Sequence, residues 1–273
     1  DIYELYDRLG PRVPLLAAVR PNGETRIEEL EAAGGTLGVM KRLAGLVHRD
    51  ALTVSGRAWG EEIAAAPVPG PVIRPVDDPV SRKPSVIVMR GNLAPEGSIL
   101  KLGDASAKQA IFEGRALVFG SQEAALEALR AGRLVPGTVA VLAGMGCRGG
   151  PGMALASGFV AAVDGAGLST TVAVITDGQL SGLNRGIAIG QVAPEAALGG
   201  PLGLVRDGDR ITIDMVAHRV RLEVDEAELE SRRRAAPAHR PADERGWLHI
   251  YERVVQPITA GAVLVAPEKD CPP

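Results

Sequence analysis

The sequence predicts an α+β fold, mainly β with helices, in which short strands form a closed or nearly closed barrel. From residue 86 onward, short apolar runs recur at close spacing, and few helical stretches interrupt them. This combination is typical of barrels. Alternation of apolar residues in the last two runs predicts an antiparallel hairpin. The expected strands are 86–89, 99–102, 116–119, 139–142, 171–175, 202–205, 211–215 and 220–224.

The first part of the chain predicts a short helical segment rather than strands. Apolar residues at helical spacing predict helices near 1–9, 27–33 and 36–46. Prolines then crowd the stretch 64–84, which favours an extended connector over a helix. We therefore expect two parts, a helical segment with a proline-rich linker at 1–79 and a barrel domain with terminal helices at 80–273.

Composition excludes several classes of function. The chain has 273 residues, 46% of them hydrophobic, and a formal net charge of −3. This charge gives no reason to expect nucleic acid or an anionic membrane as a partner, and 3% aromatic residues leave few platforms for stacking bases. No apolar run is long enough to span a bilayer and no secretory signal opens the chain, so we expect the cytoplasm. Its start at Asp1 suggests part of a longer protein.

A glycine-rich stretch after the expected strand 171–175 is the first candidate for a site. Gly178 and Gly182 bracket Ser181, so the backbone there can approach a small molecule closely. The turn Gly149–Gly152 precedes a stretch that reads as a helix, whose first N–H groups would suit a carboxylate or phosphate. Taken alone, each turn is equally compatible with an ordinary tight turn, and Ser181 with a hydroxyl that bonds its own backbone.

Four motifs resemble the dihydroxy-acid dehydratase and 6-phosphogluconate dehydratase family. They are GNLAPEG at 91–97, GGPGM at 149–153, TDGQLSG at 176–182 and PEAALGGP at 194–201. The resemblance implies a C-terminal barrel of the swivelling type, preceded by the end of an N-terminal α/β domain. In relatives, the rest of that domain supplies cluster cysteines, magnesium ligands and a carbamylated lysine. We therefore expect an N-terminal dehydratase domain or subunit as a partner, together with a homodimer.

The family's reaction removes water from a 2,3-dihydroxy acid or a sugar acid and yields a 2-keto acid. In relatives, an iron–sulfur cluster acts on the departing hydroxyl, magnesium holds the substrate, and a serine is the base. By motif, that serine is Ser181. The chain by itself is expected to bind no cofactor and to be inactive, because its two cysteines, Cys147 and Cys271, cannot ligate such a cluster. The complete enzyme would need both the cluster and magnesium.

Four more residues are candidate contacts to a small-molecule hydroxy acid. Asn92 either lines the pocket or stabilises a turn through its amide. Asp177 either reaches a ligand or orients the N–H groups of a glycine loop, and Gly182 gives the backbone access to the substrate. Arg185 either pairs with a carboxylate or is solvated. We expect Ser181 at the mouth of the barrel, facing a space that another stretch of protein completes.

Departures from the family pattern leave a second function open. Met145 stands where the family places a glutamate that contacts magnesium, and a thioether does not suit that ion. Gln179, Leu180 and Gln191 also replace the arginine, phenylalanine and histidine common at those positions. The alternative is therefore a non-catalytic relative that binds a small acid or serves in assembly. A further alternative is a barrel with an unrelated ligand function, because a fold does not fix an activity.

Overall fold

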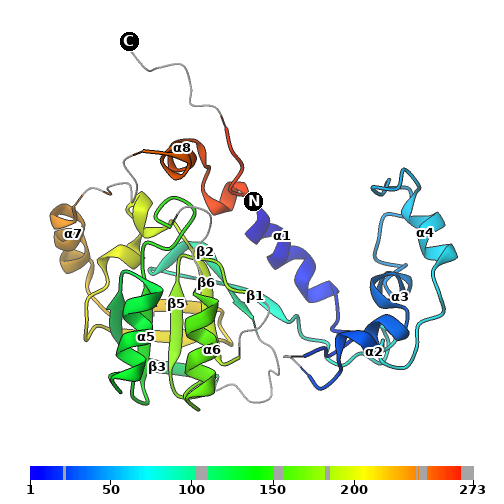
Figure 1. Ribbon diagram of the computed structural model, residues 1–273, viewed down its shortest axis with the longest axis horizontal. Helices are drawn as coiled ribbons and strands as arrows, with labels where there is room; N and C mark the ends of the chain where they lie inside the picture. Colours follow the sequence, from blue (N-terminus) through cyan, green and yellow to red (C-terminus); the bar gives the residue numbers. More distant parts are fainter. Residues whose placement is uncertain are drawn as a thin grey trace, which may run out of the picture. The chain divides into compact units, whose positions relative to one another are not determined.

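The computed structural model describes residues 1–20, 23–101, 110–150, 156–181, 185–237, 239 and 245–265. The chain forms two compact units, one of Asp7–Ser85 and one of Asp1–Tyr6 with everything from Val86 onward. The larger unit is built on a closed barrel with the strand order β1-β2-β6-β5-β4-β3-β7-β8 (Figure 1). The prediction of an α+β barrel of about eight strands is therefore confirmed.

The barrel combines a block of parallel strand pairs with a block of antiparallel pairs. Strands β3 to β6 pair in parallel, in the order β3-β4-β5-β6, and the other pairs are antiparallel except for one parallel contact between β1 and β8. The expected hairpin is present as β7 and β8, with Ile213 opposite Val220. The strands are β1 Val86–Gly91, β2 Ala94–Lys101, β3 Ile111–Phe119, β4 Thr138–Leu142, β5 Ala173–Thr176, β6 Ile187–Ala193, β7 Arg210–Asp214 and β8 Arg219–Leu222.

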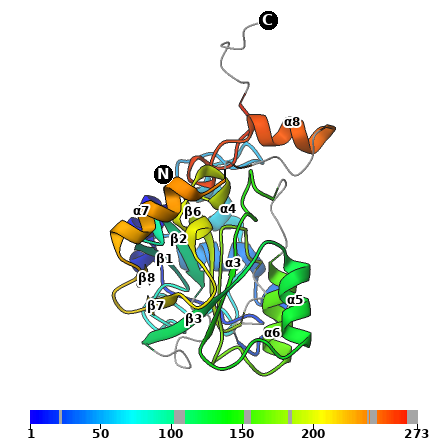
Figure 2. The same ribbon diagram turned by 90° about the vertical axis from the view of Figure 1, so that its left-hand side faces the viewer.

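The barrel has an apolar interior and a second apolar layer outside its parallel strands. Every residue of β4 and of β5 is buried, as expected for strands covered on both faces. Inward-facing residues from all eight strands form the interior core. Outside, α5 (Gln122–Arg130) and α6 (Ser157–Gly165) pack against β3, β4 and β5 (Figure 1). Figure 2 shows these two helices together on one side of the barrel.

The remaining helices are short, and they begin and end at identifiable signals. Helix α7 starts where the side chain of Asp225 accepts the N–H of Glu228, and α5 starts where Ser121 accepts the N–H of Ala124. None of the helices in the described part of the chain has the length and apolar character that a membrane crossing requires. The other α-helices are α1 Ile2–Leu9, α2 Ile27–Ala32, α3 Gly35–Arg42, α4 Trp59–Ala65, α7 Glu226–Ala235 and α8 Trp247–Val254.

Two expectations for the barrel were wrong. The run 202–205 is not a strand but lies in the 3-10 helix η4 (Pro201–Leu204), because the proline follows two glycines and starts a tight turn that buries Leu202. In its place, the strand β6 lies between β5 and β2. Two more 3-10 helices, η3 (Ala196–Leu198) and η5 (Ile258–Ala260), follow β6 and α8, and η1 (Gly10–Arg12) follows α1.

The smaller unit, Asp7–Ser85, has a core of its own around Leu16, Ala33 and Ile73. The proline-rich stretch belongs to this unit. Its backbone bonds to the helical part, with the N–H of Gly70 donating to the carbonyl of Ala33 at 2.8 Å and the N–H of Arg74 to Leu16 at 2.8 Å. These bonds hold the stretch against the short helices, which are otherwise too short to be stable alone.

Candidate active site beyond the end of β5

The segment 177–181 leaves the end of β5 and folds back toward β6. The hydroxyl Oγ1 of Thr176 accepts the N–H of Gly178 at 3.0 Å, and the carbonyl of Gly178 accepts the N–H of Gln191 at 2.8 Å. A Cβ at residue 178 would stand 2.8 Å from the carbonyl oxygen of Met145, so only glycine fits there without a shift. Glycine at 178 therefore lets the segment pass close to Met145, three residues before Ser181.

Ser181 is exposed, and bonds from two other elements fix its backbone. Its N–H donates to the Oγ of Ser157, the first residue of α6, at 2.7 Å. Its carbonyl oxygen accepts the Nζ of Lys101, the last residue of β2, at 2.8 Å. The same ammonium donates to the carbonyl of Leu180 at 3.3 Å. The backbone of Ser181, the candidate base, is thus held by hydrogen bonds, while the residue is exposed at the surface.

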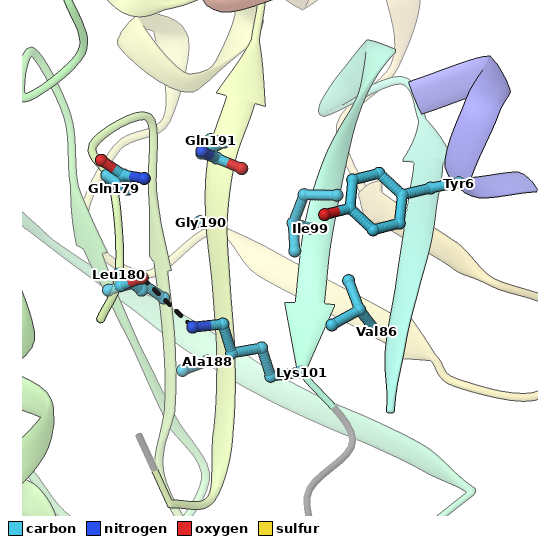
Figure 3. Close-up of a pocket in the computed structure, with 9 residues that line it drawn as sticks. All are labelled: Tyr6, Val86, Ile99, Lys101, Gln179, Leu180, Ala188, Gly190 and Gln191. Atoms are coloured by element: carbon cyan, nitrogen blue, oxygen red, sulfur yellow. Dashed lines mark hydrogen bonds between the residues drawn. The ribbon is translucent and has the colours of Figure 1, made fainter. Parts of the chain in front are cut away.

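A pocket of about 220 Å³ lies next to this segment, on the outer face of the barrel (Figure 3). Strands β1, β2 and β6 form its floor, and Leu180 and Gln179 form the wall nearest to Ser181. It is smaller than the roughly 300–1,000 Å³ common for ligand pockets, so it suits a small acid or one end of a larger molecule. Its lining residues are Tyr6, Val86, Ile99, Lys101, Gln179, Leu180, Ala188, Gly190 and Gln191.

Gln191 lies in the pocket in an unusual backbone conformation. Its φ is 55°, in the left-handed region that residues with a side chain rarely adopt. Two hydrogen bonds hold it there: its N–H donates to Gly178, and its carbonyl accepts the hydroxyl of Tyr3 at 2.6 Å. Burial raises the pKa of that hydroxyl, which therefore stays protonated and able to donate. Such strain is common where a side chain must point to a ligand.

Two buried carboxylates shape the loop at 144–149. The Oδ1 of Asp177 accepts the N–H of Met145 at 2.8 Å, and its Oδ2 accepts the N–H groups of Gly144 and Ala196 at 3.0 and 2.9 Å. Burial raises the pKa of Asp177, and the three backbone hydrogen bonds act in the opposite direction. Of the two roles expected for Asp177, the structure shows contacts for orienting loop N–H groups.

Glu195 is the second buried carboxylate of this loop. It accepts the N–H of Arg148 at 3.1 Å and that of Gly149 at 3.3 Å. A Cβ at Gly146 would stand 1.9 Å from its Oε2, so the loop needs glycine there. Burial raises the pKa of Glu195, and the backbone bonds oppose this shift. Both carboxylates therefore act on the backbone and not on the pocket.

The described residues do not fit a metal centre by themselves. Met145 is buried, and its thioether offers no hard oxygen ligand. Burial, and next the charge of Glu195, raise the pKa of Cys147 to about 11, so this thiol is neutral near pH 7. Among the residues that the structure describes, no group of three or more His, Cys, Asp or Glu is placed to hold a metal ion.

The other residues that the sequence singled out are scattered. The amide of Asn92 bonds the backbone of Leu222 twice, donating to its carbonyl and accepting its N–H, each at 2.8 Å. It lies beside a groove with Arg90, Arg219 and Arg221, and not among the residues that line the pocket near Ser181. Arg185 is exposed. Gly182 lies outside the described residues, as do Pro151, Gly152 and Met153 of the GGPGM motif.

Sequence reasoning missed four residues that hold the site. Lys101, Ser157 and Tyr3 come from β2, α6 and α1, and only the folded chain brings them to Ser181 and Gln191. Glu195 lies inside the PEAALGGP motif, and the sequence signal for it is a carboxylate two residues after the apolar run of β6. A lone lysine that ends an apolar strand was the corresponding signal for Lys101.

Comparison with known proteins decides the family. Residues 71–262 match the model of the dihydroxy-acid/6-phosphogluconate dehydratase C-terminal domain, and residues 2–62 match that of the corresponding N-terminal domain. The chain belongs to this dehydratase family. The match at 2–62 shows that the smaller unit carries sequence of the family's N-terminal domain.

Individual members of the family are similar over almost the whole chain. The dihydroxy-acid dehydratase of Pelobacter propionicus is 43% identical over 96% of this chain, and that of Ignicoccus hospitalis is also 43% identical over 96%. The dihydroxy-acid dehydratase of Pyrococcus furiosus is 42% identical over 96%. In each case the matched part is 48% of the relative, so the chain spans about half the length of the curated relatives it matches.

Proposed function

We propose that this chain is the substrate-side part of a hydro-lyase that converts a 2,3-dihydroxy acid to a 2-keto acid, with Ser181 as the base that removes the proton from C2. One observation carries the proposal. Ser181 is an exposed side chain on a backbone held by Ser157 and Lys101, directly beside a pocket for a small molecule. The relatives named dihydroxy-acid dehydratase support the same reaction.

The chemistry needs a base in a fixed place. A proton on the carbon next to a carboxylate is weakly acidic, so the base must be held close to it in the correct direction. The close backbone approach at Gly178 and the two hydrogen bonds of the Ser181 backbone support this position. The amides of Gln179 and Gln191, which line the pocket, would bind the hydroxyl and carboxylate oxygens of the substrate. Arg185, exposed four residues after Ser181, is our proposed partner for the carboxylate.

The whole enzyme needs more than the described residues. We propose that the residues for an iron–sulfur cluster and for magnesium come from a further N-terminal dehydratase region, and that the protein works as a homodimer. Two observations support a contribution from elsewhere: the relatives are about twice as long as this chain, and the residues around Met145 do not fit a metal. When bound, these groups would act on the departing hydroxyl and the carboxylate of the substrate.

A second candidate function is the binding of a small acid without catalysis, in assembly with a complete subunit. The observation that favours it is again Met145, which is buried and bonded to Asp177 at the position where the resembling family places a magnesium ligand. In this case the pocket would be kept while turnover is lost.

One experiment separates the two functions. The chain is joined to the part of the Pelobacter propionicus relative that it does not match, loaded with iron and magnesium, and assayed for formation of a 2-keto acid from 2,3-dihydroxy acids and from sugar acids. We expect turnover of a dihydroxy acid that Ser181→Ala abolishes while the visible absorption of the cluster stays intact. Ser55→Ala, which removes an exposed hydroxyl from the other unit, is the control. Saturable binding of the acid without turnover would support the second function instead.

A further inference from the structure

Lys101 connects two parts of the site that the chain itself separates widely. It ends β2 with its side chain on the outer face of the barrel, in the pocket (Figure 3). Its Nζ donates to the carbonyl oxygens of Leu180 at 3.3 Å and of Ser181 at 2.8 Å. One ammonium therefore binds two successive carbonyls of the segment that carries the candidate base.

The position of this ammonium has an electrostatic cost. Burial lowers the pKa of Lys101, because the charged form loses part of its hydration in the pocket. The carbonyl oxygens of Leu180 and Ser181 replace some of that hydration. Among the described residues that line the pocket, Tyr6 is the only other titratable side chain.

We propose that Lys101 is a positioning residue for Ser181: its ammonium fastens the segment 177–181 to β2 and places a positive charge beside the candidate base. This inference rests on the proposed function of Ser181. A serine hydroxyl is a weak base until a nearby cation favours its alkoxide. Lys101 provides such a cation: it extends from β2 and bonds the carbonyl of Ser181, whose hydroxyl must lose its proton.

The first test concerns the hydrogen bonds from Lys101 to the segment 177–181 and does not depend on enzyme activity. Hydrogen exchange of the segment 177–181 is measured on this chain as wild type, Lys101→Met and Lys101→Arg. We expect exchange of the Ser181 amide to become faster by about tenfold in Lys101→Met, since one hydrogen-bonding partner of the segment is lost. The control is Lys41→Met, because the Nζ of Lys41 also donates to a backbone carbonyl, that of Ala66 at 2.6 Å, but in the other unit. Unchanged exchange in Lys101→Met would overturn the proposal.

The second test concerns the charge and uses the joined enzyme. We expect Lys101→Met to lower kcat by about 100-fold with little change in KM, since a displaced base affects the chemical step more than binding. Lys101→Arg keeps its charge at alkaline pH, so it should retain part of kcat and move the alkaline limb of the kcat profile to higher pH. If Lys101→Arg and Lys101→Met behave alike at every pH, the charge has no role. Full turnover of Ser181→Ala would instead overturn the proposed function. The hydrogen-exchange result would still show whether Lys101 holds the segment 177–181.

Discussion

The N–H of Ser181 donates to the Oγ of Ser157 at 2.7 Å, and so joins the segment after β5 to the first turn of α6. Ser157 precedes Ser181 by 24 residues and lies just beyond the GGPGM motif. The TDGQLSG motif is therefore joined to α6 by a side chain that lies outside the motif.

Removal of the Ser157 hydroxyl should weaken the site without unfolding the protein. In Ser157→Ala the amide of Ser181 loses its acceptor, and the position of Ser181 becomes less defined. We expect kcat of the joined enzyme to fall by about tenfold with KM nearly unchanged. Ser157→Thr keeps an oxygen at the same place and is the matched control. Equal losses in the two variants would show that the hydrogen bond is not the cause.

The stability of the loop 144–149 should depend on pH through Glu195. Its pKa in the folded protein is raised above the ordinary 4.5, so the folded state holds this proton at a pH where the unfolded state has lost it. The contribution of Glu195 to stability therefore falls as pH rises through this window. Glu195→Gln cannot titrate, and one amide oxygen can accept both N–H groups. Its free energy of unfolding relative to wild type should increase between about pH 4 and about pH 8.

The contribution of Asp209 to stability should depend on pH in the opposite direction, which makes it a comparison for Glu195. Burial acts to raise the pKa of Asp209, but the hydrogen bonds from Arg232 and from the N–H of Arg206 outweigh it and hold this pKa below its ordinary value. Its contribution is present above the unfolded-state pKa and is lost as pH falls through the folded-state value. Asp209→Asn should therefore be more destabilising at about pH 8 than at about pH 3 in urea titrations. Parallel pH trends for the two variants would contradict this assignment.

Arg232 should matter far more than its neighbours in the run 232–234. Its side chain is 9% exposed, and it bonds Asp209 at 3.1 Å, Glu228 at 2.8 Å and the carbonyl of Leu204 at 3.0 Å. Arg232→Met removes a buried donor from all three acceptors, although Arg206 still donates to Asp209 and Glu228. We expect a loss of about 2–3 kcal/mol in the free energy of unfolding. Arg234→Met, at a side chain that is 70% exposed, should change it by less than about 0.5 kcal/mol.

Gly91 should tolerate no side chain. Its φ is 153°, and an added Cβ would stand 1.9 Å from the carbonyl oxygen of Val220, at the contact between β1 and β8. Gly91→Ala should therefore lower the free energy of unfolding by at least about 3 kcal/mol, measured by urea titration. Gly120→Ala, where an added Cβ meets no atom within 4 Å, should be nearly neutral. Similar losses in both variants would remove the steric explanation.

Strands with a regular apolar pattern could be predicted from sequence, whereas β6, whose apolar run contains a glycine, could not. The β7–β8 hairpin was evident because Ile211, Ile213 and Val220 alternate with polar residues. Strand β6 was missed because Gly190 interrupts its apolar run, and the structure shows why a glycine is there: a Cβ would meet the side chain of Leu180 at 2.9 Å. The arginine run 232–234 reads as a solvated helix end, yet tertiary contacts bury Arg232.

The candidate site was predictable only in the residues that one motif contains. Ser181 and Asp177 stand together in TDGQLSG, and both lie beyond the end of β5. The partners Lys101 and Ser157 lie 80 and 24 residues away from Ser181, and no local pattern expresses such pairings. Asn92 shows that a motif residue need not belong to the site. Its amide could line a pocket, but it hydrogen-bonds the backbone of Leu222 instead.

The barrel closes between its first strand and its last, and this has a consequence for how the protein is made. During synthesis β1 emerges before β8, and its edge toward β8 has no partner until Leu222 has left the ribosome. An exposed strand edge invites pairing with other chains. Nascent chains that stall before the β7–β8 hairpin should therefore be the aggregating species, and a chaperone that shields strand edges should act on this protein until β8 has emerged.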